Sequence, residues 1–258
     1  MSEIKKILTI SKFTIKEVIQ SKILFNVIFL GLFLLLITAI AFKFTYGSPS
    51  RIALDFGLGT LSLSAIGISL FMGISLISNE LESRTIYMIL SRPVKRSSFI
   101  IGKYLGLALV VLLNIAILAT LTLSVFVYTG GDISSLIIFS LVYILAEALL
   151  MLSLVGVLSL ITNKVMTVIL AITIYVIGHA IAAAKTTTLV KITPALAKLL
   201  DFYHFILPGF YKLNLKDLVL YDQKVSDLYI YGNLLYACLY IFFLTFLSIF
   251  IFNRKNLD

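Results

Sequence analysis

Six long apolar runs dominate the sequence. They are residues 23–42, 56–77, 104–128, 136–161, 165–184 and 234–252. A membrane-spanning helix needs about 20 apolar residues, because each residue adds about 1.5 Å along the helix axis. The runs are continuous, whereas transmembrane β-strands alternate in polarity over about 10 residues. The pattern therefore predicts an all-α membrane protein with six transmembrane helices in one domain.

The composition supports the same class of protein. Hydrophobic residues make up 60% of the chain and charged residues 13%, against about 45–50% and about 25% in soluble domains. These values exclude a soluble enzyme, a disordered chain and a disulfide scaffold, and the single cysteine, Cys238, lies inside an apolar run. We interpret the net charge of +9 as lysines and arginines that fix the topology beside an anionic membrane face, so no nucleic acid is expected as a partner.

The distribution of basic residues predicts the orientation. Six spans place both termini on one side, and most lysines and arginines outside the runs fall in segments on that side. The two short segments on the other side hold only Lys43 and Arg51. By the positive-inside rule, we expect a multi-pass protein of the plasma (inner) membrane with both termini cytoplasmic and residues 185–233 outside.

Helical patterns also occur outside the spans. Residues 1–22 predict a lysine-rich amphipathic helix lying on the cytoplasmic leaflet, with an exposed charged tail as the alternative. Its apolar face comprises Ile4, Ile7, Leu8, Ser11, Ile15, Val18 and Ile19. In the outer segment, Thr193-Pro194 predicts the start of a helix that Pro208-Gly209 ends, and residues 215–220 predict a second short helix.

The cytoplasmic segment 78–103 carries a helix pattern of its own. Asn79, with Glu82 three residues later, has the form of a helix N-cap box. An apolar stripe follows, and Arg92-Pro93 ends the helix before Ser97 caps the next span; the stripe is formed by Ile86, Ile89 and Leu90. An apolar stripe outside the bilayer predicts contact with a protein partner.

Motifs for nucleotide, metal or covalent chemistry are not found in the sequence. Gly102-Lys103 resembles the end of a phosphate-binding loop, but Ser97 stands where the first glycine would be required. His179, near the outer end of its span, is expected to form an interhelix hydrogen bond in preference to ligating a metal, and His204 to lie on a surface helix, either solvated or at the membrane interface. We therefore expect no catalytic residue, no metal site and no cofactor in this chain.

Glu147 is the one formally charged residue inside the six runs. An ionisable group at this depth is costly, so it is expected to face the bundle interior and to have a partner. Counting residues from the outer ends of the spans places Asn114 at a similar depth and predicts it as that partner. Two interpretations stay open: a purely structural hydrogen bond, or a role in a translocation path.

The segment 78–103 resembles the signature of ABC-2 type transporter permeases. The family has an acidic pair, a Gly-Thr, a Leu-Leu-Ser-x-Pro-x-x-Arg stretch and a Gly-Lys that begins the next span. Here the matching residues are Glu80, Glu82, Thr85, Leu90, Pro93, Arg96, Gly102 and Lys103, with Arg84 in place of the usual glycine. The layout of spans is also similar, and the branch that it most resembles contains permeases for multicopper-enzyme maturation.

The resemblance implies a type V exporter-like fold with an N-terminal elbow helix. It also implies a permease subunit that is not itself an enzyme, dimerises as a homo- or heterodimer and binds two copies of a separate ATP-binding subunit. Ile86, Ile89 and Leu90 would form the apolar contact with that subunit. The charged rim would comprise Glu80, Glu82, Arg84, Arg92 and Arg96, although Glu82 has the alternative role of capping its own helix. Two other functions are considered: an ion-gradient-driven secondary transporter and a non-transporting membrane assembly factor.

Overall fold

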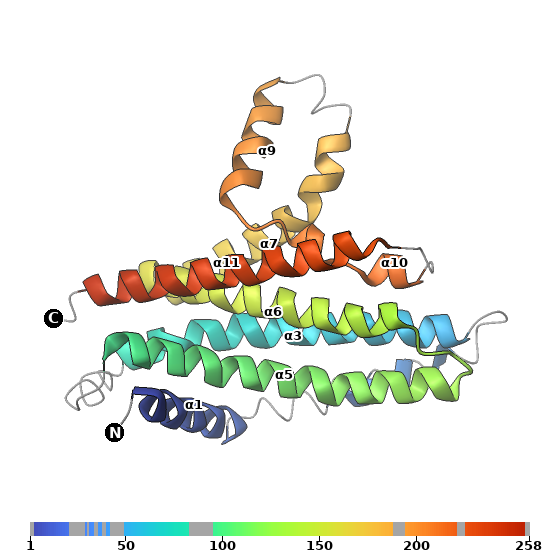
Figure 1. Cartoon of the computed structure of the whole chain (residues 1–258), viewed down its shortest axis with the longest axis horizontal. Coiled ribbons are helices and arrows are strands. Elements are labelled where there is room, and N and C mark those ends of the chain that lie inside the picture. Colours follow the sequence, from blue (N-terminus) through green and yellow to red (C-terminus); the bar gives the residue numbers. More distant parts are fainter. Residues whose placement is uncertain are drawn as a thin grey trace.

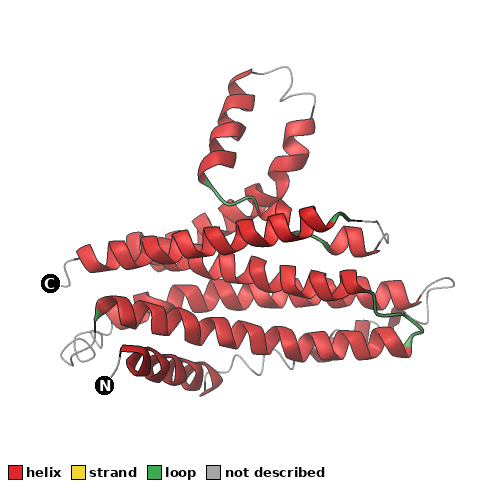
Figure 2. Cartoon of the chain, in the orientation of Figure 1, coloured by secondary structure: helices red, strands yellow, loops and turns green. Residues whose placement is uncertain are grey.

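The structure is a computed structural model that describes residues 3–20, 29, 31–33, 36–37, 40–41, 49–82, 95–187, 194–220 and 225–255. For residues 75–82 and a few between 186 and 217 it describes the backbone alone. Helices joined by short loops make up this part of the chain (Figure 2). The all-α prediction therefore holds for the residues that are described.

The described elements follow one another in a simple order. They are α1 (Glu3–Gln20), α3 (Pro49–Glu82), α5 (Arg96–Tyr128), α6 (Ser135–Ile161), α7 (Lys164–Thr186), α9 (Pro194–Ile206), the 3-10 helix η1 (Phe210–Leu213), α10 (Lys216–Leu220) and α11 (Asp227–Arg254). Within the described ranges, α3, α5, α6, α7 and α11 are long and apolar enough to cross a membrane. They correspond to five of the six predicted spans. The other, residues 23–42, falls largely outside the described residues, although those described between 29 and 41 are helical.

The long helices α3, α5, α6 and α11 lie side by side along the length of the molecule (Figure 1). The helix α1 lies against the first part of α5, and α9 forms a hairpin with the end of α7 that projects from the side of the bundle. The start of α1, the start of α5 and the end of α11 lie at the same end, which we call the terminal end. This arrangement brings three elements that are far apart in the sequence together at one end of the bundle.

The helix α6 forms the centre of the bundle. In its most apolar window 72% of the residues are buried, against 22% in α7 and 17% in α11. Its buried side chains pack on α3 and α5 on one side and on α11 on the other, and Leu150, Val155 and Tyr143 are completely enclosed. The outer faces of α7 and α11 instead expose apolar side chains, as expected for helices that face lipid.

The helix boundaries around segment 78–103 differ from the prediction. The helix α3 continues to Glu82, so Asn79 lies inside it and does not begin a new helix. The next helix starts at Arg96 after the N-cap Lys95, so Ser97 lies in its first turn and does not cap it. The apolar runs mark only the membrane-embedded part of each helix, because backbone hydrogen bonding continues through polar residues beyond the bilayer.

The elements after α7 agree with the predicted pattern. The helix α9 starts at Pro194 and ends two residues before Pro208, and α10 covers 216–220. The side chain of Lys185 forms an ion pair with Asp201 at 2.7 Å, which joins α7 to α9. The Tyr203 hydroxyl donates a hydrogen bond to the carbonyl of Ile174 at 2.8 Å. The hairpin is thus held by polar contacts along its length.

Candidate functional site

Glu147 lies at the centre of the bundle and is completely buried. Its Oε1 atom lies 2.8 Å from Nε2 of His179 and accepts a hydrogen bond from the Tyr175 hydroxyl at 3.0 Å. Both partners are on α7, where residues four apart share a face. The expectation that Glu147 faces other helices is confirmed, and so is the interhelix hydrogen bond predicted for His179.

The predicted pairing of Glu147 with Asn114 is wrong. The Asn114 amide is occupied by Ser64 of α3, which donates to Oδ1 at 3.2 Å and accepts from Nδ2 at 3.1 Å. Counting depth from the outer helix ends assumes that every span is equally long and upright. The helices α6 and α7 are joined by the tight turn at Thr162 and Asn163, so their common reference is that turn. Counted from it, Glu147 and His179 each lie about four helical turns away and are level.

Aromatic side chains enclose this cluster. The Phe210 ring of η1 stacks on His179, with centroids 6.0 Å apart, and meets Tyr175 edge-on at 5.1 Å. The Oε2 atom of Glu147 is buried and has no hydrogen-bond partner among the described residues. A buried carboxyl oxygen without a donor is costly in apolar surroundings. The cluster can accept one more hydrogen bond at Oε2, but it contains no activated nucleophile.

Metal binding has no support in the described part of the chain, because no group of three His, Cys, Asp or Glu side chains comes together there. Glu147 and His179 are in contact, but they supply only two possible metal ligands. The side chain of His204, predicted to lie on a surface helix, is outside the described residues.

Arg96 is the first residue of α5 and binds the C-terminal end of α11. Its guanidinium donates to the carbonyl oxygens of Phe252, Asn253 and Lys255 at 3.3, 3.3 and 3.0 Å. The last carbonyls of a helix lack donors within the helix, and a cation placed there also interacts favourably with the negative end of the helix dipole. Arg96, predicted at the rim of a partner contact, therefore has partners within its own chain.

The other residues predicted to contact a partner are not tested by the structure. Glu80 and Glu82 form part of the last turn of α3, and only their backbone is described. The remainder fall in residues 83–94, outside the described residues; they are Arg84, Ile86, Ile89, Leu90 and Arg92. Their role stays a prediction from the sequence.

The helix α1 docks on the start of α5 through small residues. A Cβ atom at Gly102 would lie 2.8 Å from the Cβ of Ile10, and one at Gly106 would lie 2.7 Å from the Cβ of Thr14. Two glycines four residues apart permit such a close approach of two helices. The sequence contains the motif Gly102-x-x-x-Gly106, which is a signal for close helix packing and could have predicted this contact.

Polar contacts strengthen the docking of α1. The Ser98 hydroxyl donates to Glu3 at 2.8 Å, and Lys103, which is mostly buried, forms an ion pair with Glu17 at 3.3 Å. The Ser98 hydrogen bond, followed by the contact with Lys6, lowers the pKa of the Glu3 carboxyl below its ordinary value of 4.5. Of the predicted apolar face, Ile4 and Leu8 stay exposed, 70% and 60%, whereas Ser11 and Val18 are buried. The position of α1 on the membrane surface stays a prediction.

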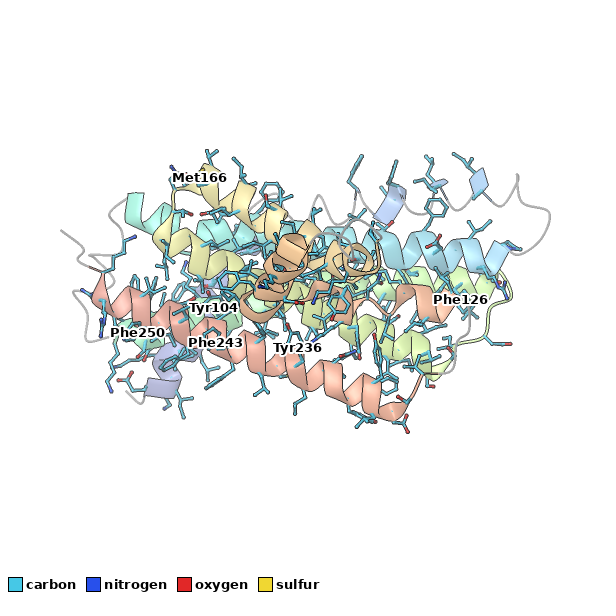
Figure 3. All side chains as sticks on the ribbon, turned by 90° about the horizontal axis from the view of Figure 1, so that it is seen from above. Tyr104, Phe126, Met166, Tyr236, Phe243 and Phe250 are labelled. Carbon is cyan, nitrogen blue, oxygen red and sulfur yellow. The ribbon has the colours of Figure 1, made fainter. Side chains whose placement is uncertain are left out.

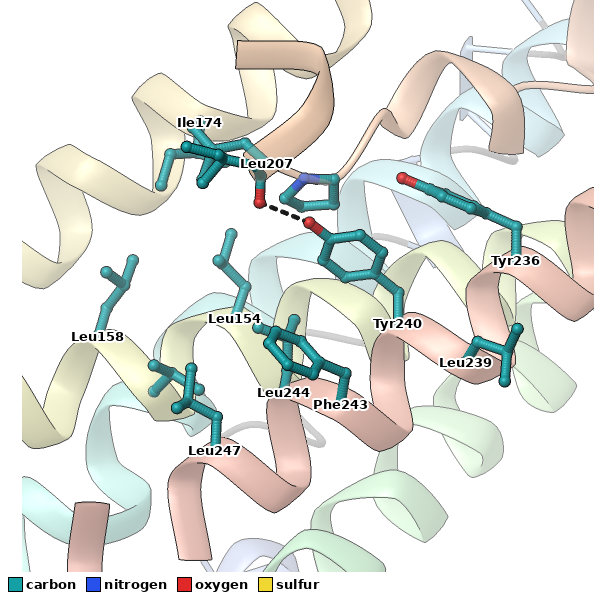
Figure 4. Close-up of a pocket in the computed structure, with 13 residues that line it drawn as sticks. Leu154, Leu158, Ile174, Leu207, Tyr236, Leu239, Tyr240, Phe243, Leu244 and Leu247 are labelled. Atoms are coloured by element: carbon teal, nitrogen blue, oxygen red, sulfur yellow. Dashed lines mark hydrogen bonds between the residues drawn. The ribbon is translucent and has the colours of Figure 1, made fainter. Parts of the chain in front are cut away.

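A lateral groove of about 690 Å³ separates α7 from α11 (Figure 4). Leucine, isoleucine and phenylalanine side chains form most of its lining, with α6 as its floor. The hydroxyl of Tyr240 donates to the carbonyl of Ile206 at 2.7 Å, and that of Tyr236 accepts from the Gly209 amide at 3.0 Å. Seen from above, Tyr236 and Phe243 lie along α11 (Figure 3). Both hydroxyls are already engaged, so the lining offers apolar contact and little polar recognition.

The chain matches one protein-family model. The family model described as ABC-2 family transporter protein matches residues 9–257, nearly the whole chain. No curated protein sequence matches the chain. The matched range includes residues 9–20 of the docked α1, the segment between α3 and α5, the Glu147 cluster and α11.

Proposed function

The chain belongs to the ABC-2 family of transporter membrane proteins, and from this premise we propose that it is the permease subunit of an ATP-driven transporter. ABC-2 membrane domains have no ATP-binding site, so the ATP is bound by a separate subunit. The observation that carries the proposal is the family match over residues 9–257. The five long apolar helices of the described residues support it, with residues 23–42 as the sixth span.

The ATP-binding subunit would contact the segment that joins α3 to α5. Its apolar residues Ile86, Ile89 and Leu90 supply the buried contact, and the charged residues around them tune specificity. The segment leads directly into Arg96, at the terminal end of the bundle. That end is cytoplasmic in the orientation that the basic residues predict, and ATP is available there.

The functional unit would contain two permease chains and two ATP-binding subunits, in contact with membrane lipid. The assignment to the branch of multicopper-enzyme maturation rests on the sequence signature and is independent of this proposal.

A second candidate function is transport driven by an ion gradient, and the buried Glu147–His179 pair is the observation that favours it. Intramembrane acid and histidine side chains form proton relays in pumps and secondary transporters. Such proteins usually contain repeated halves and more intramembrane charges. Here Glu147 is the one formally charged residue in the six predicted runs, so the ATP-driven function is the stronger proposal.

The proposal is tested by purifying the tagged chain from its source membranes in mild detergent. The ATPase activity that co-purifies and the polypeptide that a photoreactive ATP analogue labels are then measured. The test variant is Leu90→Asp, which places a charge in the proposed apolar contact. The control is Ile133→Asp, which places the same charge at the exposed turn between α5 and α6, at the far end of the bundle.

We expect ATPase activity to co-purify with the wild-type chain and with Ile133→Asp, and to be lost with Leu90→Asp. Equal co-purifying ATPase activity in both variants would show that the segment between α3 and α5 is not the contact site. No co-purifying ATPase with the wild type would contradict the proposed function. Transport that persists without ATP and stops when the ion gradient is dissipated would support the second candidate.

A further inference from the structure

The start of α5 holds the end of α11 by contacts of three kinds. Arg96 donates to three backbone carbonyls of α11, and Phe99 stacks on Phe252 with ring centroids 6.0 Å apart. Further along, the hydroxyls of Tyr104 and Ser248 share a hydrogen bond at 2.8 Å. Phe252 and Ser248 are completely buried, so the contact is shielded from water.

The same part of α5 also holds α1. Gly102 and Gly106 allow the backbones of the two helices to approach closely, since a Cβ at Gly106 would lie 2.9 Å from the carbonyl oxygen of Ser11. Hydrogen bonding from Ser98 to Glu3 fixes the beginning of α1, and the ion pair of Lys103 with Glu17 fixes its end. Residues 96–106 of α5 therefore connect α1 and α11, which lie at opposite ends of the chain.

The contact between α11 and α7 is of a different kind. The apolar groove separates these two helices. The Tyr236 hydroxyl binds the Gly209 amide and the Tyr240 hydroxyl binds the carbonyl at the end of α9, so neither bonds α7. In a bilayer, apolar contact between helices competes with equally apolar lipid tails, so it holds helices together less firmly than packed small residues and hydrogen bonds. The end of α11 is thus tied to α5 and, through the bond from Lys255 to the Leu160 carbonyl, to the end of α6, whereas the groove separates the middle of α11 from α7.

We propose that α1, residues 96–106 of α5 and residues 248–255 of α11 move as one unit, which we call the terminal unit. Arg96 is its positioning residue, because one guanidinium nitrogen, Nη1, donates to three carbonyls of α11. A lysine ammonium, with three donors on one nitrogen, could replace part of this contact. The inference rests on the proposed function, in which the ATP-binding subunit displaces the segment directly before α5. A displacement of that segment would then move α11 against α7 and change the width of the groove.

The test measures distances between pairs of spin labels in a Cys238→Ala background. Labels are placed at exposed positions by Lys12→Cys on α1, Phe246→Cys on α11 and Ile169→Cys on α7. The chain is measured alone, and then with its co-purified ATP-binding subunit, without nucleotide and with ATP and vanadate. Each pair is measured in the wild type, Arg96→Ala, Arg96→Lys and the control Arg254→Ala, which removes an exposed arginine from the end of the same helix.

In the chain alone, we expect a narrow α1–α11 distance distribution that broadens in Arg96→Ala. It should broaden less in Arg96→Lys and stay unchanged in Arg254→Ala. With the ATP-binding subunit, nucleotide should shift the α7–α11 distance and leave the α1–α11 distance constant. In Arg96→Ala the subunit should stay bound while the α7–α11 shift is lost, an outcome that a merely structural arginine would not give.

Two results would overturn the terminal unit. One is an α1–α11 distribution in the chain alone that is identical in the wild type and both Arg96 variants, since Arg96→Lys tests the point even if Arg96→Ala does not fold. The other is a nucleotide-dependent change in the α1–α11 distance as large as that in the α7–α11 distance. Failure to co-purify an ATP-binding subunit would contradict the proposed function, whereas the measurements on the chain alone still decide whether the unit exists.

Discussion

Arg96 at the terminal end and Glu147 in the centre of α6 are both charged, but they have different kinds of partner. Arg96 bonds backbone carbonyls, and Glu147 bonds side chains. Arg96 supplies donors to carbonyls at the end of α11, where a helix runs out of its own donors, although the Phe252 carbonyl also accepts a hydrogen bond from the Lys255 amide. Glu147 lies where the backbone is already fully bonded within the helix, so it depends on the side chains of a neighbouring helix. Its Oε1 has two hydrogen-bonding partners, Tyr175 and His179, and its Oε2 has none among the described residues.

This difference separates a fixed part of the molecule from one that can change. At the terminal end the side chain of Lys255 repeats the arrangement by donating to the carbonyl of Leu160, at the end of α6, at 2.9 Å. Two helix ends are thus capped by basic side chains from other elements. The Glu147 cluster instead keeps an unused acceptor and a partner, His179, whose side chain is 27% exposed. The terminal end is held by fixed contacts, whereas the cluster keeps an acceptor, Oε2, that another hydrogen-bonding group could use.

The largest loss of stability is expected from Gly156→Ala, which adds a methyl group next to Tyr104. A Cβ at Gly156 would collide with the Tyr104 hydroxyl, so Gly156→Ala should displace Tyr104 and break its hydrogen bond with Ser248. Overpacking of this kind costs about 1–3 kcal/mol. The control Gly67→Ala adds the same methyl group where the structure has open space. The midpoint of thermal unfolding in detergent should fall for the first variant only, and equal midpoints would contradict the described packing.

A smaller loss of stability is expected from substitutions of Glu147. Glu147→Gln keeps an acceptor for Tyr175 and should unfold close to the wild-type midpoint. Glu147→Leu removes both hydrogen bonds, and measured interhelix hydrogen bonds in membranes average about 0.6 kcal/mol each. The matched control is Asn114→Leu, which breaks only the pair with Ser64. A loss in Glu147→Gln as large as in Glu147→Leu would show that the carboxyl itself is required.

The smallest effect is expected from the pH dependence of α1 docking. The Glu3 pKa is lowered in the folded chain, so its carboxylate favours docking above pH 4.5. That contribution is lost as the pH falls through the folded-state pKa. A spin label at Lys12→Cys in Cys238→Ala should therefore gain mobility between neutral pH and about pH 3. In Glu3→Gln this transition should be reduced, and an identical transition in both proteins would assign it to other groups.

The sequence predicted the spans well because their signal is local. A run of about 20 apolar residues is sufficient to predict a transmembrane helix, whatever it packs against. The start of α9 at Pro194 and its end before Pro208 were also visible, because proline acts on the backbone at its own position. The boundaries near Asn79 and Ser97 were wrong, since an apolar run reports the bilayer and not the full length of a helix.

The contacts within the candidate site were harder to predict. The partner of Glu147 depends on the tight turn between α6 and α7, which sets the depth of His179 relative to it. The carbonyls that Arg96 binds belong to α11, more than 150 residues later, and nothing in a local pattern pairs these two segments. The motif Gly102-x-x-x-Gly106 did carry a usable signal for a close helix contact, but it does not identify α1 as the partner.

The central claim is that the segment before Arg96 faces the cytoplasm, where an ATP-binding subunit can reach it. The most direct measurement uses Ser91→Cys and Thr187→Cys, each alone in Cys238→Ala, with a thiol reagent that does not cross the membrane. In intact cells the reagent should label position 187, and it should label position 91 only after the membrane is permeabilised. Labelling of position 91 but not of position 187 in intact cells would contradict the account.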